Sequence, residues 1–474
     1  MLDNRLGLVY IGMDVFFDKG RVFMKASHER VSKCHSASLY DCLRKNGSSV
    51  ICMIAAMILG ITGVVRGSVS PADAPEVWQQ WRGSQRDGTV KTSPWPDRLD
   101  DAHLKMLWRQ DIGCGYSGPI VSENLVFTVE TQDKEHEIVR AFNRTSGEQI
   151  WETSWAGAMK VPFFASRNGS WVRSTPAYDG KNLYVAGMRD VLVSLNAKNG
   201  TVNWRLNFME HFGTPLPDFG LVCSPLLAYG AVYIQAGGGL VKVDQVTGKV
   251  LWRSLKDGGG IYGSAFSSPI LHELNGVPQL LVQTRNILAG VTPDDGVVLW
   301  EQPVKAFRGM NILTPVVLGD TIFTSSYGGG SLLYSSKQTA GTFNISQLWQ
   351  DTRSQGYMST PVVIDGHIYL VRRDRRFCCI DPKAKEVMWV SKERFSQYWS
   401  MIANDTRIIA LDQKGELLLI EADPKTFKLL DRRKIAKQET WAHLAVADDQ
   451  VFVRELKAIA AYRWSASSDE APSP

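Results

Sequence analysis

The stretch AFNRTSGEQIW, residues 141–151, forms a short turn closed by a tryptophan, and variants of it recur along the chain. The variants are SLNAKNGTVNW (194–204), KVDQVTGKVLW (242–252), GVTPDDGVVLW (290–300) and CIDPKAKEVMW (379–389). Self-similarity at a period of about 20–50 residues is the sequence signature of repeat proteins. We therefore expect the 474 residues to be built from one small unit that is used many times.

Two landmarks define the units. Tryptophans recur at intervals of 40 to 53 residues, at Trp108, Trp151, Trp204, Trp252, Trp300, Trp349 and Trp389. A Gly-Pro or Ser/Thr-Pro dipeptide opens most units, ending at Pro119, Pro176, Pro225, Pro269, Pro315 and Pro361, and weaker starts follow near Met401 and Leu444. These landmarks predict eight units.

The second unit, STPAYDGKNLYVAGMRDVLVSLNAKNGTVNW (174–204), shows the internal pattern. Short apolar or alternating runs are separated by turns at Asp179-Gly180 and Asn199-Gly200. Gly and Asn favour such turns because hairpin turns require positive φ. Four antiparallel strands per unit, repeated radially, form a propeller blade. The predicted fold is therefore an all-β, eight-bladed β-propeller of four-stranded antiparallel blades.

The recurring tryptophans are predicted to be structural docking residues. A single four-stranded sheet cannot bury both of its faces, so it must stack on its neighbours. An indole on the outer strand can fill the gap to the next blade, and its burial stabilises the fold by about 2–3 kcal/mol.

Ring closure is predicted from the two ends of the repeat region. The last unit ends at AIAAYRW (458–464) and has no fourth strand, whereas HLKMLWRQDIG (103–113) precedes the first unit and belongs to no blade. We expect Lys105–Asp111 to supply the outer strand of the eighth blade, because otherwise a sheet edge would stay unpaired.

The N-terminal region resembles an export signal. Arg44 and Lys45 precede an apolar run, Val50–Val65, that is followed by small and polar residues. This layout is typical of a cleaved secretory signal, with an uncleaved signal anchor or a buried core helix as alternatives. The expected domains are an extension (1–74, with Met24 as an alternative start), a propeller (75–464) and a disordered tail (465–474). The expected location is exported, periplasmic or cell-envelope, with membrane contact only through residues 50–65.

Composition excludes one class of partner. The net charge of +5 is not gathered into a basic stripe along the repeats, so nucleic acid is not expected as a partner. Instead we expect a monomer that binds an envelope or extracellular protein or polymer.

The repeat resembles the tryptophan-docking motif of the pyrroloquinoline quinone (PQQ) repeat. The resemblance rests on AFNRTSGEQIW, VDQVTGKVLW and VTPDDGVVLW, and the opening EVWQQWRGSQRDGTV (76–90) is similar to the start of secreted PQQ-like propellers. It covers about 76–464 and implies the PQQ-like β-propeller family. That family includes quinoprotein alcohol dehydrogenases and BamB-type propellers, so the fold alone does not decide the function.

The resemblance offers an enzymatic alternative. Quinoprotein dehydrogenases bind Ca²⁺ through Glu and Asn, use an Asp base, place a Trp under the quinone and often carry two adjacent cysteines. No residue-by-residue match to these ligands is found here, so no catalytic residue, metal site or cofactor is expected. The alternative is a PQQ- and calcium-dependent alcohol or sugar dehydrogenase with a diverged site. A weaker third possibility is a sensor-like role, suggested by similar propellers fused to kinases.

The cysteines do not form a disulfide framework. Cys378 and Cys379 are neighbours on a predicted strand and should point to opposite faces, each filling one gap between blades, with a vicinal disulfide as the alternative. Cys114 and Cys223 both lie just before innermost strands, and whether they pair is left open.

The funnel face is the predicted ligand or partner face. The connections 152–172, 205–221, 253–265, 301–311 and 390–398 are the long ones, and loops on a rigid scaffold commonly carry binding residues. Candidates beside strand starts or in turns of this face are Tyr116, Trp171, Arg173, Arg189, Phe266, Arg285, Asn311, Tyr327, Tyr357, Arg372, Tyr398, Trp399, Trp441 and His443. The alternative is that these residues only line and plug a narrow channel.

Two expectations separate the hypotheses. Carboxylates that converge at the funnel would favour a dehydrogenase, whereas an aromatic rim with few carboxylates would favour a non-catalytic binding or scaffold module, the preferred interpretation. The basic run RRDRR (372–376) is expected to be a solvated turn, with an anionic ligand at the funnel as the alternative.

Overall fold

The computed structural model describes residues 13–18, 21–26, 76–91, 95–258 and 265–465. The chain divides into two compact units, Met1–Ala74 and Pro75–Pro474. In the first unit, β1 (Met13–Asp18) pairs with β2 (Arg21–Ala26) as an antiparallel hairpin. The predicted signal segment (50–65) and almost all of the predicted tail lie outside the described residues. Within the described part of the chain, no helix is long and apolar enough to cross a membrane.

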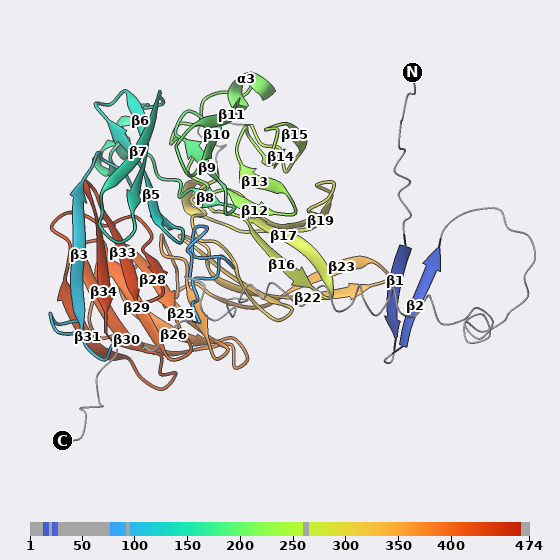
Figure 1. Ribbon diagram of the computed structural model, residues 1–474. Helices are drawn as coiled ribbons and strands as arrows, with labels where there is room; N and C mark the ends of the chain where they lie inside the picture. The colour runs from blue at the N-terminus through green and yellow to red at the C-terminus, as the bar shows by residue number, and fades with distance from the viewer. Residues whose placement is uncertain (1–12, 19–20, 27–75, 92–94, 259–264, 466–474) are drawn as a thin grey trace, which may run out of the picture. The chain divides into compact units, whose positions relative to one another are not determined.

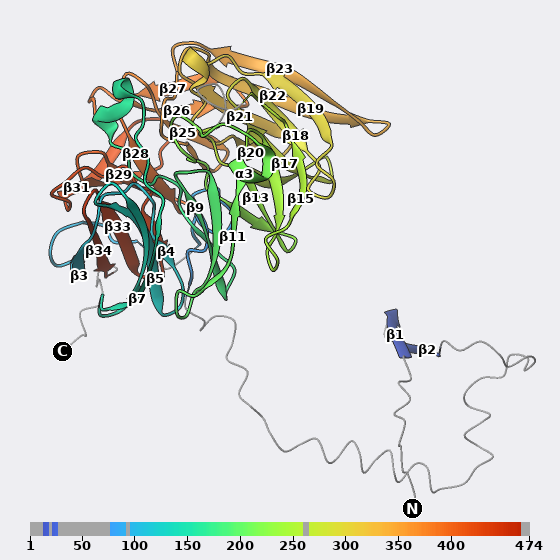
Figure 2. The same ribbon diagram turned by 90° about the horizontal axis from the view of Figure 1, so that it is seen from above.

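The second unit is an eight-bladed β-propeller, as predicted (Figures 1 and 2). Each blade is a four-stranded antiparallel sheet whose strands follow one another from the inside outwards. Blade 1 comprises β4 (Ile120–Val121), β5 (Leu125–Gln132), β6 (His136–Asn143) and β7 (Gln149–Ala156). Blade 2 comprises β8 (Ala177–Tyr178), β9 (Asn182–Gly187), β10 (Val191–Asn196) and β11 (Val202–Asn207). Blade 3 comprises β12 (Leu226–Ala228), β13 (Ala231–Gln235), β14 (Leu240–Asp244) and β15 (Val250–Ser254).

The remaining blades repeat this order. Blade 4 comprises β16 (Ile270–Leu274), β17 (Val277–Gln283), β18 (Ile287–Val291) and β19 (Val298–Pro303). Blade 5 comprises β20 (Val316–Leu318), β21 (Thr321–Ser326), β22 (Gly330–Thr339) and β23 (Thr342–Asp351). Blade 6 comprises β24 (Val362–Ile364), β25 (His367–Val371), β26 (Phe377–Asp381) and β27 (Glu386–Val390). Blade 7 comprises β28 (Trp399–Ala403), β29 (Arg407–Asp412), β30 (Glu416–Glu421) and β31 (Lys428–Lys434).

The closing blade confirms the predicted closure. Blade 8 comprises β32 (Ala445–Ala447), β33 (Gln450–Glu455) and β34 (Ala458–Trp464), and its outer strand is β3 (Leu104–Asp111). The register runs from Leu104 opposite Trp464 to Asp111 opposite Ala458. In Figure 2, β3 therefore lies beside β34 although the two strands come from opposite ends of the propeller sequence. The strand β3 closes the ring because it pairs with β34, which would otherwise have an unpaired outer edge.

The tryptophan-closed turns contact one another from blade to blade. The Trp151 indole N–H donates to the Ala197 carbonyl of the next blade at 3.0 Å, and a Cβ on Gly200 would lie 2.5 Å from the Trp151 ring. Gly200 also has φ +73°, which disfavours any side chain. The indoles of Trp108, Trp204 and Trp252 repeat this contact with the carbonyls of Arg144, Gln245 and Asp294 and with Gly147, Gly248 and Gly296. Each turn therefore needs glycine to receive the preceding indole.

The contact changes beside blade 5. Trp300 donates instead to Oε1 of Gln279 in its own blade at 2.7 Å. In blade 5, the turn that would receive Trp300 is replaced by the long hairpin β22–β23, which extends beyond the other blades (Figure 2). The Trp389 indole returns to the usual pattern and donates to the Asp423 carbonyl of blade 7 at 2.9 Å.

Hydrogen bonds to side-chain hydroxyl groups explain why many units open with Ser or Thr. The N–H groups of Gly118, Thr175 and Ser224 donate to the hydroxyls of Thr175, Ser224 and Ser268, each one blade further on, at 2.9–3.0 Å. The Thr314 N–H donates to the Thr360 hydroxyl at 3.1 Å in the same way. Since buried N–H groups need partners, these hydroxyls hold the innermost strands together around the axis.

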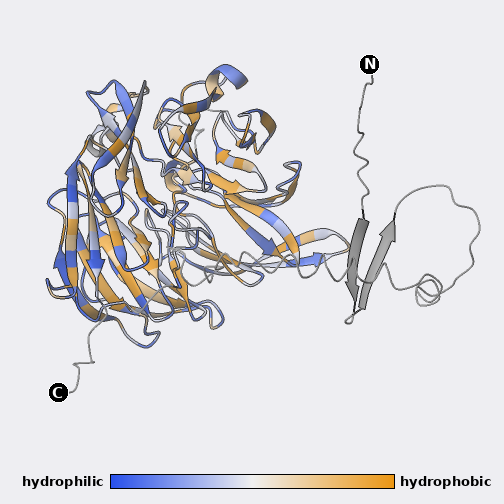
Figure 3. Cartoon of the chain, in the orientation of Figure 1, coloured by the Kyte–Doolittle hydropathy of each residue, from blue (hydrophilic) through white to orange (hydrophobic). Residues whose placement is uncertain are grey.

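The core consists of apolar layers between neighbouring blades. Figure 3 shows apolar residues concentrated along the strands and polar residues at the turns. Cys378 packs with Phe323 and Leu370, whereas Cys379 packs in a different cluster with Tyr369 and Trp399. Both cysteines are buried and free, which confirms the packing interpretation. Cys114 and Cys223 are free as well, so they do not pair in this structure.

Candidate ligand-binding funnel

The segment from Glu76 to Lys91 runs through the centre of the ring. The Trp78 N–H donates to the Val121 carbonyl of blade 1 at 2.8 Å, and the Val90 N–H donates to the Ala403 carbonyl of blade 7 at 2.9 Å. Arg82 and Arg86, almost fully buried, lie between these anchors. We call residues 76–91 the axial segment because they run through the centre of the ring, where they contact blades that are far apart in sequence.

The two axial arginines donate to backbone carbonyls just before innermost strands. Arg82 donates to Thr360 and Pro361 of blade 6 at 3.0 and 2.7 Å. Arg86 donates to the carbonyls of Pro225 and Ser224 of blade 3 at 2.7 and 3.1 Å. Burial lowers the pKa of each guanidinium to about 10, so both remain charged near neutral pH. These bonds connect the axial segment to blades 3 and 6.

Trp81 forms the floor of the space above the axial arginines. Its ring lies 5.7 Å from the Arg82 guanidinium carbon and 5.6 Å from that of Arg86. The same ring contributes to a funnel cavity of about 950 Å³, within the size range of ligand sites. Every blade contributes to this cavity through the segment before its innermost strand: Tyr116, Arg173, Val222, Phe266, Ile312, Tyr357, Tyr398 and Trp441 lie on blades 1 to 8 in that order.

Aromatic rings form two continuous groups in the funnel. Phe163 and Phe164 belong to the 3₁₀ helix η1 (Phe163–Asn168) and are 88% and 54% exposed. Ring centroids connect Phe164 to Phe219 at 6.1 Å and Phe219 to Phe266 at 5.5 Å, both edge to face. On the other side, Tyr398 stacks on Trp441 at 5.6 Å. Such rings supply large contact area with few rotatable bonds, which suits a binding surface.

Positive charge accompanies the rings. Arg173 lies 5.5 Å from the Tyr116 centroid, Arg285 4.9 Å from that of Phe266, and Arg308 5.2 Å from that of Phe307. Phe307 and Arg308 belong to the short 3₁₀ turn η3 (Phe307–Gly309). No Asp or Glu is among the residues described as lining the funnel cavity. The lining is therefore aromatic and cationic, a combination that favours anionic or aromatic ligand groups.

The structure brings seven of the predicted residues together in the funnel cavity: Tyr116, Arg173, Phe266, Arg285, Tyr357, Tyr398 and Trp441. Tyr327 lines an adjoining space at the rim. Trp171 is half-buried and hydrogen-bonded to the Tyr116 side chain. Arg189 is exposed, and Arg372 pairs with Asp374 at 3.1 Å. Neither Arg189 nor Arg372 is part of the cavity lining.

Three predicted residues are structural. Trp399 is only 1% exposed and packs between blades against Phe377 and Phe395. The Asn311 amide donates to the carbonyls of Thr284, Arg285 and Val304 at 3.0–3.3 Å, which fixes the connection before β20.

His443 is the third structural residue. It lies beside Trp78 and Trp81, and its Nδ1 is 2.9 Å from the Leu444 carbonyl. Burial, aided by the charge of Arg82, lowers the pKa of His443 to about 3. The imidazole is therefore neutral near neutral pH and too weakly basic for general-base work there.

Sequence reasoning missed part of the lining, namely Trp81, Phe164, Phe219, Phe307, Arg308 and Met310. Phe164 and Phe219 lie within connections that the sequence marks as long, so apolar residues in polar loops were the available signal. Trp81 gives no such signal, because its place depends on how the axial segment threads the ring.

The lining does not fit a calcium-bound quinone. Calcium takes six to eight oxygen ligands, and carboxylates usually supply several of them. The funnel cavity has no carboxylate in its described lining, and the described residues contain no cluster of three or more His, Cys, Asp or Glu that could hold a metal. The described lining therefore does not supply the oxygen ligands that a calcium-bound quinone needs.

Comparison with known proteins gives a family. The family model described as outer membrane protein assembly factor BamB matches residues 135–391, more than half of the chain. The BamB of Yersinia pestis is 22% identical over 73% of this chain and 85% of its own length. The BamB of Escherichia coli is 21% identical over 73% of this chain and 85% of its own length.

Solved structures share the fold. BamB from Moraxella catarrhalis superposes with a TM-score of 0.55 at 12% identity, covering 76% of this chain and 98% of that protein. Quinohemoprotein alcohol dehydrogenase from Comamonas testosteroni superposes with a TM-score of 0.59, also at 12% identity, covering 84% of this chain and 82% of that protein. At this identity both likenesses concern the fold alone.

Proposed function

The chain belongs to the PQQ-like propeller family described as outer membrane protein assembly factor BamB, and from this premise we propose that it is a non-catalytic binding subunit of the cell envelope. It would be exported by its N-terminal segment, cleaved or retained as an anchor, and would hold an envelope protein against its funnel face. The relatives are named for assembly in the outer membrane, which supports a protein partner rather than a small substrate.

One observation carries this proposal: the funnel lining comes from all eight blades and is aromatic and cationic, with no carboxylate among its described residues. Aromatic residues and arginine are the residue types that most often dominate binding energy at protein interfaces. Phe164 belongs to this lining, and Phe163, which is 88% exposed, continues the aromatic surface outside the cavity, where a protein partner can reach it.

A paired substitution tests the proposal in the organism that makes the protein. Phe219→Asp introduces a charge into the aromatic group, whereas Val246→Asp changes an 83% exposed residue in the turn between β14 and β15, away from the funnel lining. Native-gel mass of the envelope complex should fall for Phe219→Asp and stay unchanged for Val246→Asp. Loss of the complex in both variants, or in neither, would count against the funnel as the binding face.

The dehydrogenase alternative makes the opposite prediction. Titration of the full chain with PQQ and Ca²⁺ should give no saturable heat or absorbance change, because the described funnel lining offers calcium no carboxylate. One-to-one binding would restore the dehydrogenase and would justify assays with alcohols and an artificial electron acceptor.

A further inference from the structure

A second cavity, which we call the rim pocket, lies beside the funnel between blades 5 and 6. It measures about 550 Å³ and is lined by Tyr327, Arg353, Gln355, Tyr357, Arg373, Asp374, Arg375 and Gln397. Tyr357 also lines the funnel cavity, so the two spaces adjoin. The run RRDRR, predicted as a solvated turn, forms one wall of the rim pocket between β25 and β26.

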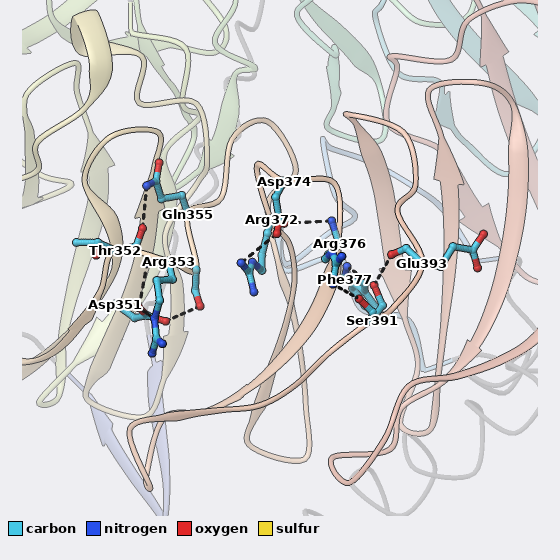
Figure 4. A network of polar contacts seen from close by, with 11 residues as sticks. Asp351, Thr352, Arg353, Gln355, Arg372, Asp374, Arg376, Phe377, Ser391 and Glu393 are labelled. Carbon is cyan, nitrogen blue, oxygen red and sulfur yellow. Dashed lines mark hydrogen bonds and ion pairs between the residues drawn. The ribbon is translucent and has the colours of Figure 1, made fainter.

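Hydrogen bonds hold both walls of the rim pocket in place (Figure 4). Gln355 donates to the Thr352 carbonyl at 2.8 Å and accepts from the Gly328 N–H at 3.0 Å. The Gln355 carbonyl accepts from the Arg373 N–H at 2.6 Å, which connects the two walls directly. The two walls are therefore ordered before any ligand binds, which lowers the entropic cost of binding.

The charge of the pocket is positive. Its single lining carboxylate, Asp374, pairs with Arg372 at 3.1 Å, and Arg353 lies 3.3 Å from Asp351. Arg373 lies 3.8 Å from the Tyr327 ring centroid and donates to the Tyr327 hydroxyl at 2.8 Å. Arg375 makes no side-chain hydrogen bond or ion pair with the other described residues. Arg373 and Arg375 therefore present positive charge that no carboxylate in the described lining neutralises.

We propose that the rim pocket binds an acidic peptide segment of a partner protein, with side-chain carboxylates at Arg373 and Arg375 and a neighbouring aromatic side chain in the funnel cavity. Guanidinium groups suit carboxylates because they donate two parallel hydrogen bonds. The pocket is wider than a single small anion needs, and it opens onto an aromatic cavity. A ligand that fills both must carry acidic and aromatic groups on one chain, as a peptide does.

This inference rests on the proposed function, since it specifies what the funnel face recognises. It adds a specificity rule, namely that acidic residues must accompany aromatic ones in the bound segment. Charge complementarity of this kind contributes to selectivity and to the association rate.

Fluorescence anisotropy of the full chain with short labelled peptides tests the proposal. In one peptide Asp alternates with Phe, and in the matched peptide Asn replaces every Asp. We expect the Asp peptide to bind at least about tenfold more tightly than the Asn peptide. The double variant Arg373→Ala/Arg375→Ala should lose this difference, whereas Arg98→Ala/Arg205→Ala, which removes two exposed arginines elsewhere, should keep it.

The outcomes distinguish the inference from the proposed function. If both peptides bind equally and Phe219→Asp weakens both, the funnel binds peptides but the rim pocket does not select charge, and the inference is wrong. Failure of the Asp peptide to bind also overturns it, while the complex assay with Phe219→Asp still judges the proposed function. Binding of phosphatidylglycerol vesicles that depends on Arg373 and Arg375, without binding of either peptide, would assign the pocket to lipid headgroups and contradict the proposal.

Discussion

At the scale of single residues, the tryptophan-closed turns, or docking turns, require glycine for two reasons. The backbone there has a positive φ, and the indole of the preceding blade leaves no room for a Cβ. Gly248 has φ +71°, and a Cβ there would lie 2.7 Å from the Trp204 ring. Gly276 has a similar φ of +78° but has open space where its Cβ would be. Gly276→Ala should therefore cost only the backbone term, about 1–2 kcal/mol, whereas Gly248→Ala should cost clearly more because Trp204 must move.

Urea denaturation of both glycine variants measures this difference. Equal losses of unfolding free energy would mean that the indole adapts without cost, and the docking turn would then need glycine only for its φ.

One buried carboxyl group, that of Glu137, makes the stability of the propeller depend on pH. Glu137 accepts from the Trp155 indole at 2.8 Å and from the Met188 N–H at 2.6 Å between blades 1 and 2. Burial raises its pKa from 4.5 to about 7. The folded state therefore binds this proton more tightly than the unfolded state, so the contribution of Glu137 to stability falls as pH rises from about 4.5 to 7, by on the order of 3 kcal/mol.

Removing the charge should remove this pH dependence. Relative to the original chain, Glu137→Gln should become steadily more stable between about pH 4.5 and pH 7, with a larger free energy of unfolding, because the variant has no buried carboxylate to ionise. The exposed Glu148→Gln should follow the original chain at every pH. A pH-independent difference for Glu137→Gln would show that Glu137 ionises as readily in the folded as in the unfolded protein.

At the scale of elements, the seams between blades are not equivalent. At the closing seam, Trp108 of β3 donates to Arg144 at 2.9 Å and packs against Gly147. At the seam between blades 5 and 6, Trp349 has no indole hydrogen bond to a described residue, and the corresponding turn carries Lys385 at φ +61° in place of glycine. Trp108→Ala should therefore destabilise the propeller by about 3–5 kcal/mol, and Trp349→Ala by less.

Thermal melting of the two tryptophan variants tests this ranking. A larger loss for Trp349→Ala would mean that closure does not depend on the Trp108 contact. Deletion of residues 75–112, which removes both β3 and the axial segment, should abolish cooperative unfolding, and an unchanged melt would refute the closure.

At the scale of the whole molecule, the repeats made the fold predictable because each blade carries its own signals. Most of the turn glycines, closing tryptophans and opening Ser/Thr make a contact with a neighbouring blade, so local motifs define the global ring. The axial segment was not predicted, because Arg82 and Arg86 find partners in blades 6 and 3 that are far away in sequence.

The lining of the funnel depends on strand register, which the sequence does not specify to one residue. Neighbouring residues of an extended chain point in opposite directions. Tyr398 therefore lines the funnel while Trp399 enters the core, and Met310 and Ile312 line it while Asn311 is buried. The prediction reached the right segments but included the buried Trp399 beside Tyr398 and named Asn311 in place of Met310 and Ile312.

Photo-crosslinking in living cells tests most directly whether the partner binds the funnel face. A photoreactive phenylalanine analogue would be placed at Phe164 in the funnel, at Tyr327 beside the rim pocket and at Val246 away from both. If the partner binds the funnel face, we expect a discrete adduct of defined mass from Phe164 and Tyr327 and none from Val246. Adducts from Val246 with none from the two funnel-face positions would contradict it.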